Sequence, residues 1–526
     1  MPDLFPKLLP FGASLLTVRA SRRLRQKSRG PAQQARALRA LLPRLAATAH
    51  GRSLGLADAR DYRAFRRQVA PRAYEYFAPL IARMMQGEAD VLWPGRTTHY
   101  AVSSRTTAGP AKHLPVSAAM LAHFRRAGLN SLLYYTARVG HTGVFRGRHL
   151  HLGGATRAVS LPTVDGFEAC AGDVCALTAL NLPRWAERHL YEPGTAIAQM
   201  ADWPAKLHAI AQRTSACDLT LIAGLPSWML VFAEVLRTQL GSRAETLQSL
   251  WPNLECFVHG GVPIAPYADD LRTAMGPTIR FHEIYAASEA FIAAQDATPD
   301  AGLRLMTDAG IFYEFLPLRD FEPDRLAELG EKAVPLDGVQ TGVDYALLLT
   351  TPAGLCRYLV GDVVRFTSVV PPRLVYVGRT QLQLNALGEN VVEKDLTDAL
   401  VAVCQRQQWT ITNFHVAPLF GQTITGQTRG RHEWWLELRP GTVKTPTGPA
   451  LATELDRELQ LRNADYKARR HGVNLLDPVV RLLMPGVFES WLRHHGQWGG
   501  LGKMPRCRSD RLVADELAQI ARFVPE

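Results

Sequence analysis

The chain has 526 residues, of which 47% are hydrophobic, 21% charged and 8% aromatic, with 41 glycines and 34 prolines. This globular composition excludes collagen-like, coiled-coil and largely disordered classes, and the length suggests two or three domains. The formal net charge of +12 favours anionic ligands. No RNA-binding or zinc-finger signature accompanies that charge, so we expect no nucleic-acid partner.

Seven cysteines are scattered along the chain without a C-x-x-C pair, a pattern typical of reduced cytoplasm. The apolar stretch over residues 8–18 is interrupted by Pro10 and followed by arginines without a small-residue cleavage site. No apolar run reaches about 18 residues. We therefore expect a cytoplasmic protein with neither a signal peptide nor a membrane span.

From residue 19 to about residue 69, Leu and Ala alternate with Arg and Gln at helical spacing. Leu38, Leu41, Leu42 and Leu45 form one such stripe, which predicts helices packed on a main body. Six basic residues fall between positions 19 and 29. We interpret them as a solvated helix face rather than a binding surface.

Beyond residue 100, short apolar runs alternate with longer helical patterns, as in 219–225 followed by 228–236. This alternation predicts βα units and a largely parallel sheet. Between residues 340 and 380 the pattern changes to short strands separated by Gly and Pro turns, at 345–350, 357–360, 363–366 and 374–377. A small antiparallel sheet or barrel is expected there.

A polar stretch over 378–390 ends this section, and helical (393–407) and strand-like (410–416, 433–438) segments follow it. The predicted fold class is α/β. A large N-terminal domain (1–380) with mixed or parallel sheets and a barrel-like section is joined by a hinge (381–390) to a smaller α+β domain (391–526).

One segment, residues 103–112, gathers hydroxyls, a Gly and a Lys within ten residues: Ser103, Ser104, Thr106, Thr107, Gly109 and Lys112. Hydroxyls and backbone N–H groups suit phosphate oxygens, and Lys112 would add positive charge. Taken alone, the segment also reads as an ordinary Ser/Thr-rich turn.

A second segment ends a short apolar strand with Tyr285, two alanines and the pair Ser288–Glu289. Tyr285 could cover a purine, and Glu289 could hold Mg²⁺, which needs carboxylate oxygen and keeps several waters. The alternative is a helix N-cap, with Ser288 capping and Glu289 favouring the helix dipole.

The third segment places Asp362 after Gly361, at an expected turn between two apolar strands. An aspartate there can accept both ribose hydroxyls. Gly-Asp turns between strands are common, so this signal is weak alone.

The order of the segments is more specific than any one of them. The three are followed by Arg379 at the end of 376–379 and by Lys503 within Gly-Gly-Leu-Gly-Lys-Met-Pro-Arg. Together they resemble the adenylate-forming enzymes, in which a phosphate loop, an aromatic-Ser-Glu segment, a ribose Asp, a hinge Arg and a late catalytic Lys follow in that order.

The specific resemblance is to the Gretchen Hagen family of acyl-acid amido synthetases, whose phosphate motif reads S-S-G-T-T-x-G-x-x-K-x-x-P. Segments at 224–228, 260–261, 313–317 and 432–434 also look like family landmarks, so the resemblance spans about residues 75 to 510.

The resemblance implies a ligase that uses ATP and Mg²⁺ to adenylate a carboxylic acid and passes the acyl group to an amine. It implies catalytic roles for Lys503 and Glu289, the latter through Mg²⁺. The nucleotide would be bound by the phosphate-segment residues with Tyr285, Ser288, Asp362 and Arg379. Acyl transfer to coenzyme A, and a non-catalytic nucleotide- or metabolite-binding protein, are the alternatives.

By the same resemblance, a helix over the 130s and the segment at 172–176 line the acyl pocket, which makes Leu132, Tyr135, Thr136 and Cys175 pocket candidates. For Cys175 an inert buried thiol is the simpler expectation. The chain departs from the family pattern at Arg105, Ala290 and Asn390. Arg105 replaces a motif Gly, and it would point outward, contact phosphate, or mark a chain that no longer binds ATP.

Overall fold

The computed structural model describes residues 5–102, 112–153, 159–161, 167–380, 383–384, 389, 391–409, 411–420, 430–439, 446–471, 475–495 and 504–524. These residues fall into two compact units. The first comprises the described residues up to 360 together with 364–375, and the second comprises 361–363 and the described residues from 376 onward. The predicted α/β class, with a large N-terminal part and a smaller C-terminal one, is confirmed.

An eleven-stranded sheet with the order β12-β13-β14-β15-β11-β10-β9-β8-β7-β3-β6 organises the first unit. Its strands are β3 (Arg148–Leu152), β6 (Tyr191–Glu192), β7 (Leu219–Gly224), β8 (Cys256–Gly260), β9 (Arg280–Ala286), β10 (Phe291–Ala294), β11 (Leu303–Leu305), β12 (Phe312–Pro317), β13 (Asp344–Thr350), β14 (Tyr358–Val369) and β15 (Pro372–Arg379). The run from β6 to β9 is parallel. The pairs β9–β10, β10–β11, β11–β15 and β12–β13 are antiparallel. The expected antiparallel section therefore exists, but it continues the parallel strands within one sheet.

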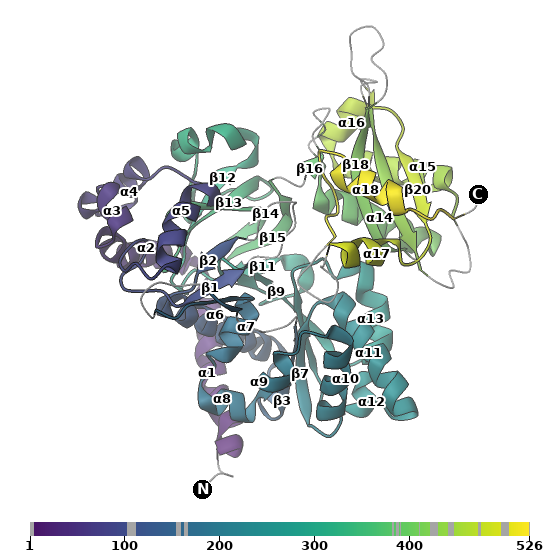
Figure 1. Cartoon of the computed structure of the whole chain (residues 1–526), viewed down its shortest axis with the longest axis horizontal. Coiled ribbons are helices and arrows are strands. Elements are labelled where there is room, and N and C mark those ends of the chain that lie inside the picture. The colour runs from purple at the N-terminus through teal and green to yellow at the C-terminus, as the bar shows by residue number, and fades with distance from the viewer. Residues whose placement is uncertain are drawn as a thin grey trace. The chain divides into compact units, whose positions relative to one another are not determined.

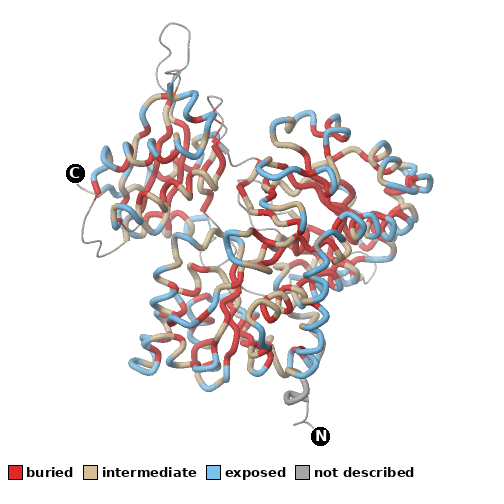
Figure 2. Tube along the Cα trace, turned by 180° about the vertical axis from the view of Figure 1, so that it is seen from behind, coloured by how far each residue is buried: buried red, intermediate tan, exposed pale blue. Residues whose placement is uncertain are grey.

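The parallel half is covered by helices on both faces, as Figure 1 shows. Ile222 of β7 and Phe257 of β8 pack against α10 (Trp203–Thr214), α11 (Pro226–Leu240) and α13 (Ala268–Met275). Their neighbours Leu221 and Val258 point the other way, toward α1 (Phe5–Arg25) and α6 (Ala118–Val139). Strands buried on both faces read as continuous apolar runs, which is why residues 219–224 are recognisable in the sequence. In Figure 2 these strands are buried, whereas the outer faces of the helices are exposed.

The N-terminal helices are present as predicted. Helix α2 (Gly30–Ala46) buries Leu38, Leu41, Leu42 and Leu45, each no more than 5% exposed. Helix α1 begins earlier than expected, at Phe5, and contains Pro10. No helix among the described residues is long and apolar enough to cross a membrane.

One strand prediction is wrong. The expected strands at 357–360 and 363–366 form a single strand, β14, which runs through Gly361 and Asp362 without a turn. Gly361 has φ of +93°, a left-handed conformation that glycine adopts without steric cost. A local change of backbone conformation inside a strand therefore produced the sequence signal of a turn.

A small sheet of order β2-β1-β5-β4 completes the first unit. It contains β1 (His99–Val102), β2 (His113–Pro115), β4 (Val159–Ser160) and β5 (Cys170–Gly172). Strands β1 and β2 are antiparallel, with Val102 opposite His113. The predicted phosphate segment therefore joins two paired strands.

The second unit is built on a three-stranded sheet, β18 (Ile411–Phe420), β19 (Gly430–Leu438) and β20 (Val479–Leu483). Helices α14 (Glu393–Gln407) and α15 (Gly448–Arg462) pack on Trp434 and Leu436. The opposite face, through Trp435, is covered by α17 (Val487–His494) and α18 (Leu512–Ile520). The helix predicted at 393–407 is confirmed. The sheet of this unit is mixed, because β18 and β19 are antiparallel whereas β19 and β20 are parallel, and helices cover both of its faces.

Candidate functional site

Lys112 is the described member of the predicted phosphate segment. Ser103, Ser104, Thr106, Thr107 and Gly109, and with them Arg105, lie outside the described residues. Lys112 is half-buried, and its Nζ lies 5.4 Å from the ring centre of Tyr74 in α5 (Tyr74–Met85). The Tyr74 hydroxyl also accepts a hydrogen bond from the backbone N–H of His113 at 2.9 Å. Tyr74 thus holds the start of β2 and lies against the lysine beside it.

Tyr285, Ser288 and Glu289 lie together at the hairpin between β9 and β10. Tyr285 is 8% exposed and pairs with Ala293 across the hairpin. The backbone N–H of Ala287 donates to the carbonyl of Ala290 at 2.9 Å, which closes the turn. Because β10 begins at Phe291, no helix starts at Ser288, and the N-cap alternative for this pair is wrong.

The carboxylate of Glu289 is held at this turn by a tyrosine from β14, 69 residues further along the chain. Glu289 is 9% exposed, and its Oε1 accepts a hydrogen bond from the hydroxyl of Tyr358 in β14 at 3.3 Å. Burial, and next the carboxylate of Glu289, raise the pKa of Tyr358 well above its usual value, so the hydroxyl stays a donor. One oriented carboxylate is a sufficient protein ligand for Mg²⁺ when phosphates and waters supply the other ligands.

His123 of α6 fixes the strand that follows Glu289, a role that no sequence pattern indicated. Its Nε2 lies 2.9 Å from the backbone N–H of Phe291, and its Nδ1 lies 2.8 Å from the carbonyl of Ala309. These partners assign the neutral ring, with Nδ1 as donor and Nε2 as acceptor. Burial lowers the pKa of His123 to about 4.

In the second unit, two of the predicted nucleotide-binding residues, Asp362 and Arg379, form an ion pair with each other. Arg379 Nε lies 3.4 Å from Asp362 Oδ1, with the side chains 37% and 6% exposed. Tyr376 is the third member of this group, and burial, with the carboxylates of Glu393 and Asp362 next, raises its pKa well above the usual value. The oxygens of an aspartate carboxylate accept hydrogen bonds, so Asp362 is chemically suited to contact hydroxyl groups.

The four candidates for the acyl pocket differ in how far they are buried. Tyr135 is fully buried and its hydroxyl donates to the carbonyl of Glu255 at 3.2 Å. Thr136 is fully buried and donates to the carbonyl of Leu133, and Leu132 is half-buried against the cluster around Tyr135. Cys175 is exposed at the start of α7 (Val174–Leu180), so the expectation of a buried thiol is wrong. It belongs to the first turn of a short helix, where side chains reach solvent.

Lys503 and Asn390 lie outside the described residues. Next to Asn390, Glu389 is fully buried, and its Oε1 lies 3.2 Å from Nε2 of His432, which is 1% exposed. This contact ties the predicted hinge to β19 within the second unit. The described residues hold no cluster of three or more His, Cys, Asp or Glu side chains that would bind a metal by themselves.

Sequence reasoning missed one buried ion pair, between Arg357 and Glu314. Two contacts of 2.9 Å join the side chains, one from Arg357 Nη2 to Glu314 Oε1 and one from Arg357 Nε to Glu314 Oε2. The arginine side chain is 0% exposed and the glutamate side chain is 1% exposed. The remaining guanidinium donors reach the carbonyls of Arg66, Val69 and Gly330. Glu314 lies in a recognised landmark, but nothing in a single sequence pairs it with a residue 43 positions away.

Comparison with protein families matches three consecutive models to this chain. They are the GH3 family N-terminal domain at residues 20–279, the GH3 family central domain at 304–379 and the GH3 family C-terminal domain at 394–512. A probable indole-3-acetic acid-amido synthetase, GH3.12 of Oryza sativa subsp. japonica, is 25% identical over 90% of both chains.

Two solved structures show how widely the fold is shared. The acyl acid amido synthetase AtGH3.15, in complex with 2,4-DB, superposes with a TM-score of 0.76, covering 97% of this chain and 98% of the other at 18% identity. A 2-hydroxyisobutyryl-CoA ligase in its postadenylation state gives a TM-score of 0.55, covering 95% and 90% at 15% identity.

Proposed function

The chain belongs to the GH3 family, and from that premise we propose that it is an ATP-dependent ligase that joins a carboxylic acid to an amine. The observation that carries the proposal is the match of all three family domains in order, from residue 20 to residue 512. The relatives found by sequence are named as amido synthetases, which favours amide formation over other uses of an acyl-adenylate.

The chemistry proceeds in two steps. A carboxylate oxygen attacks the α-phosphorus of ATP, giving acyl-AMP and pyrophosphate. An amine then attacks the acyl carbon, and AMP leaves as the amide forms. Carboxylates are poor acylating agents at neutral pH, so the first step converts a bad leaving group into a good one. The protein positions the reacting oxygens and stabilises the charge that develops.

Each candidate residue takes one task in this proposal. Asp362 accepts hydrogen bonds from the ribose hydroxyls, and Tyr285 lies against the adenine. The hydroxyls of the phosphate segment and Lys112 bind the phosphates, with Ser288 and Arg379 completing the nucleotide site. Glu289, already oriented by Tyr358, would hold Mg²⁺, which screens triphosphate charge when bound.

Lys503 is the proposed catalyst of the first step, because its charge would balance the negative charge shared by carboxylate and α-phosphate oxygens. Lys503→Ala should lower acid-dependent ATP–pyrophosphate exchange by about 100-fold, on the order of 3 kcal/mol. Synthetic acyl-AMP with an amine should still give amide within a few-fold of the parent rate. Equal loss in both assays would contradict a role confined to adenylation.

The experiment that tests the function is a panel of acids assayed for ATP–pyrophosphate exchange. Indole-3-acetic acid and 2,4-DB enter first, because relatives are named for or bound to them. The best acid is then offered ammonia, diamines and amino acids, and the product is identified by mass. An amide supports the proposal. A thioester, formed only when coenzyme A is present, would favour acyl transfer to coenzyme A, because a CoA ligase shares this fold. The absence of exchange with every acid would favour a non-catalytic binding protein.

The cellular setting is part of the proposal. No disulfide joins any of the seven cysteines, which supports a reduced compartment such as the cytoplasm.

A further inference from the structure

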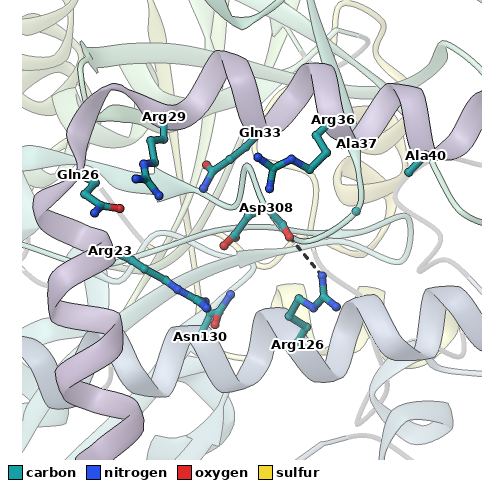
Figure 3. Close-up of a pocket in the computed structure, with 11 residues that line it drawn as sticks. Arg23, Gln26, Arg29, Gln33, Arg36, Ala37, Ala40, Arg126, Asn130 and Asp308 are labelled. Atoms are coloured by element: carbon teal, nitrogen blue, oxygen red, sulfur yellow. Dashed lines mark hydrogen bonds between the residues drawn. The ribbon is translucent and has the colours of Figure 1, made fainter.

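A cavity of about 650 Å³ lies in the first unit, lined by the end of α1, the start of α2 and one face of α6. None of its lining residues belongs to the candidate nucleotide site. Figure 3 shows side chains of the three helices pointing into one space, with Asp308 between them. The volume falls within the range of small-molecule sites, roughly 300–1,000 Å³.

Four arginines give this cavity its charge: Arg23, Arg29, Arg36 and Arg126. In the described part of the chain, none of the four forms an ion pair with a carboxylate. Arg126 instead donates to the backbone carbonyl of Asp308 at 3.4 Å. Asp308 supplies the only carboxylate among the lining residues, so the cavity carries a net positive charge.

Helical periodicity explains why these side chains converge. Arg29, the last residue of η1 (Lys27–Arg29), is followed at i+4 and i+7 by Gln33 and Arg36 of α2. Because Arg29 has helical backbone angles, this spacing places the three residues on one face. The leucines of α2 are buried on a different face. Ala37 and Ala40 continue the cavity face with small side chains that leave space. On α6, Arg126 and Asn130 are likewise four residues apart.

We propose that this cavity binds a small soluble organic polyphosphate, outside the proposed ligase site. Guanidinium groups bind phosphate oxygens through paired hydrogen bonds, and four of them match several phosphate charges. The amides of Gln26, Gln33 and Asn130 add neutral donors. An adjoining cavity of about 190 Å³ shares these amides and Asp308 and adds Leu129, Leu133 and Tyr134, which suit the organic part of the ligand.

The test uses two variants with the same loss of charge from the same helices. Arg23→Gln/Arg36→Gln/Arg126→Gln removes one cavity arginine each from α1, α2 and α6. The control, Arg25→Gln/Arg39→Gln/Arg125→Gln, removes exposed arginines of α1, α2 and α6 that do not line the cavity. Inorganic tripolyphosphate is titrated into each protein by calorimetry, with EDTA and about 150 mM NaCl. Circular dichroism checks that all three proteins are folded.

We expect tripolyphosphate to bind the parent and the control alike, and the cavity variant at least about tenfold more weakly. Superimposable titrations for parent and cavity variant, or equal losses in both variants, would overturn the proposal. Vesicles containing anionic phospholipid form a second arm. Binding to vesicles with none to tripolyphosphate would assign the arginines to a membrane surface and overturn the small-molecule site. Because no acid or ATP is present, the result does not depend on the ligase activity.

Discussion

Two of the arginine–carboxylate pairs formed by β14 or by the residue just before it differ in almost every physical respect. Arg357 and Glu314 are sealed from water and joined by two contacts of 2.9 Å. Asp362 and Arg379 meet at one contact of 3.4 Å, and the arginine is 37% exposed. The sealed pair is closed to solvent, whereas the open pair is reached by solvent through its arginine. We therefore expect a structural role for the sealed pair, and the exposure of the open pair is compatible with the binding role proposed for it.

The largest effect is expected from breaking the sealed pair. Glu314→Gln keeps the shape but leaves the Arg357 charge uncompensated, so the free energy of unfolding should fall by about 3–5 kcal/mol. Chemical denaturation measures the loss. The double variant Glu314→Leu/Arg357→Met should be more stable than the single one, since both charges are removed. A Glu314→Gln protein as stable as the parent would show that the pair is not sealed.

The buried side chain of His123 should make the stability of the protein depend on pH. Burial lowers the pKa of His123 to about 4, below its usual 6.5. The unfolded chain therefore binds a proton at pH 5 that the folded chain does not, and stability falls as pH drops from 6.5 toward 4. For a shift of this size His123 contributes about 3 kcal/mol of that loss. Denaturation midpoints between pH 7 and 4.5 should fall less steeply in His123→Gln.

Other buried histidines, such as His149 and His415, also have pKa values lowered to about 4 by burial. The His123 variant should therefore flatten the pH dependence only in part. An unchanged slope would mean that His123 is protonated in the folded protein.

Breaking the open pair, Asp362–Arg379, should change the affinity for the nucleotide rather than the stability of the fold. Asp362→Ala removes the acceptor for the ribose hydroxyls and should weaken ATP binding at least about tenfold with the fold intact. The matched control is Asp344→Ala, which breaks the Arg365–Asp344 pair, also half-exposed and formed by β14. Calorimetry should show parent-like ATP affinity for the control. Unchanged affinity in a folded Asp362→Ala protein would remove Asp362 from the site.

The smallest effects are expected at Glu289, which lies between the two extremes at 9% exposure. Glu289→Gln should lower adenylation, and excess Mg²⁺ should partly restore it, because the variant loses charge but not size. Tyr358→Phe, which removes only the orienting hydroxyl, should raise the Mg²⁺ requirement by no more than about threefold. Overlapping Mg²⁺ titrations for Glu289→Gln and the parent would exclude a role through the metal.

Local sequence determined much of this protein: helix 393–407, strand β7 and its following helix, the buried leucines of α2, and motifs whose order identified the family. These features depend on periodicity and on residues close together in the chain, and a single sequence displays both.

Tertiary structure alone decided the rest. Arg357 meets Glu314 across 43 residues, and His123 meets Phe291 across 168. The same packing brings four arginines from α1, η1 (Lys27–Arg29), α2 and α6 around one cavity, although the sequence of residues 19–29, which supplies two of them, indicates only a solvated face. Such contacts depend on which elements lie side by side in the folded protein. That arrangement is determined by the burial of apolar surface over the whole core, to which residues far apart in the sequence contribute together. No local pattern carries that information.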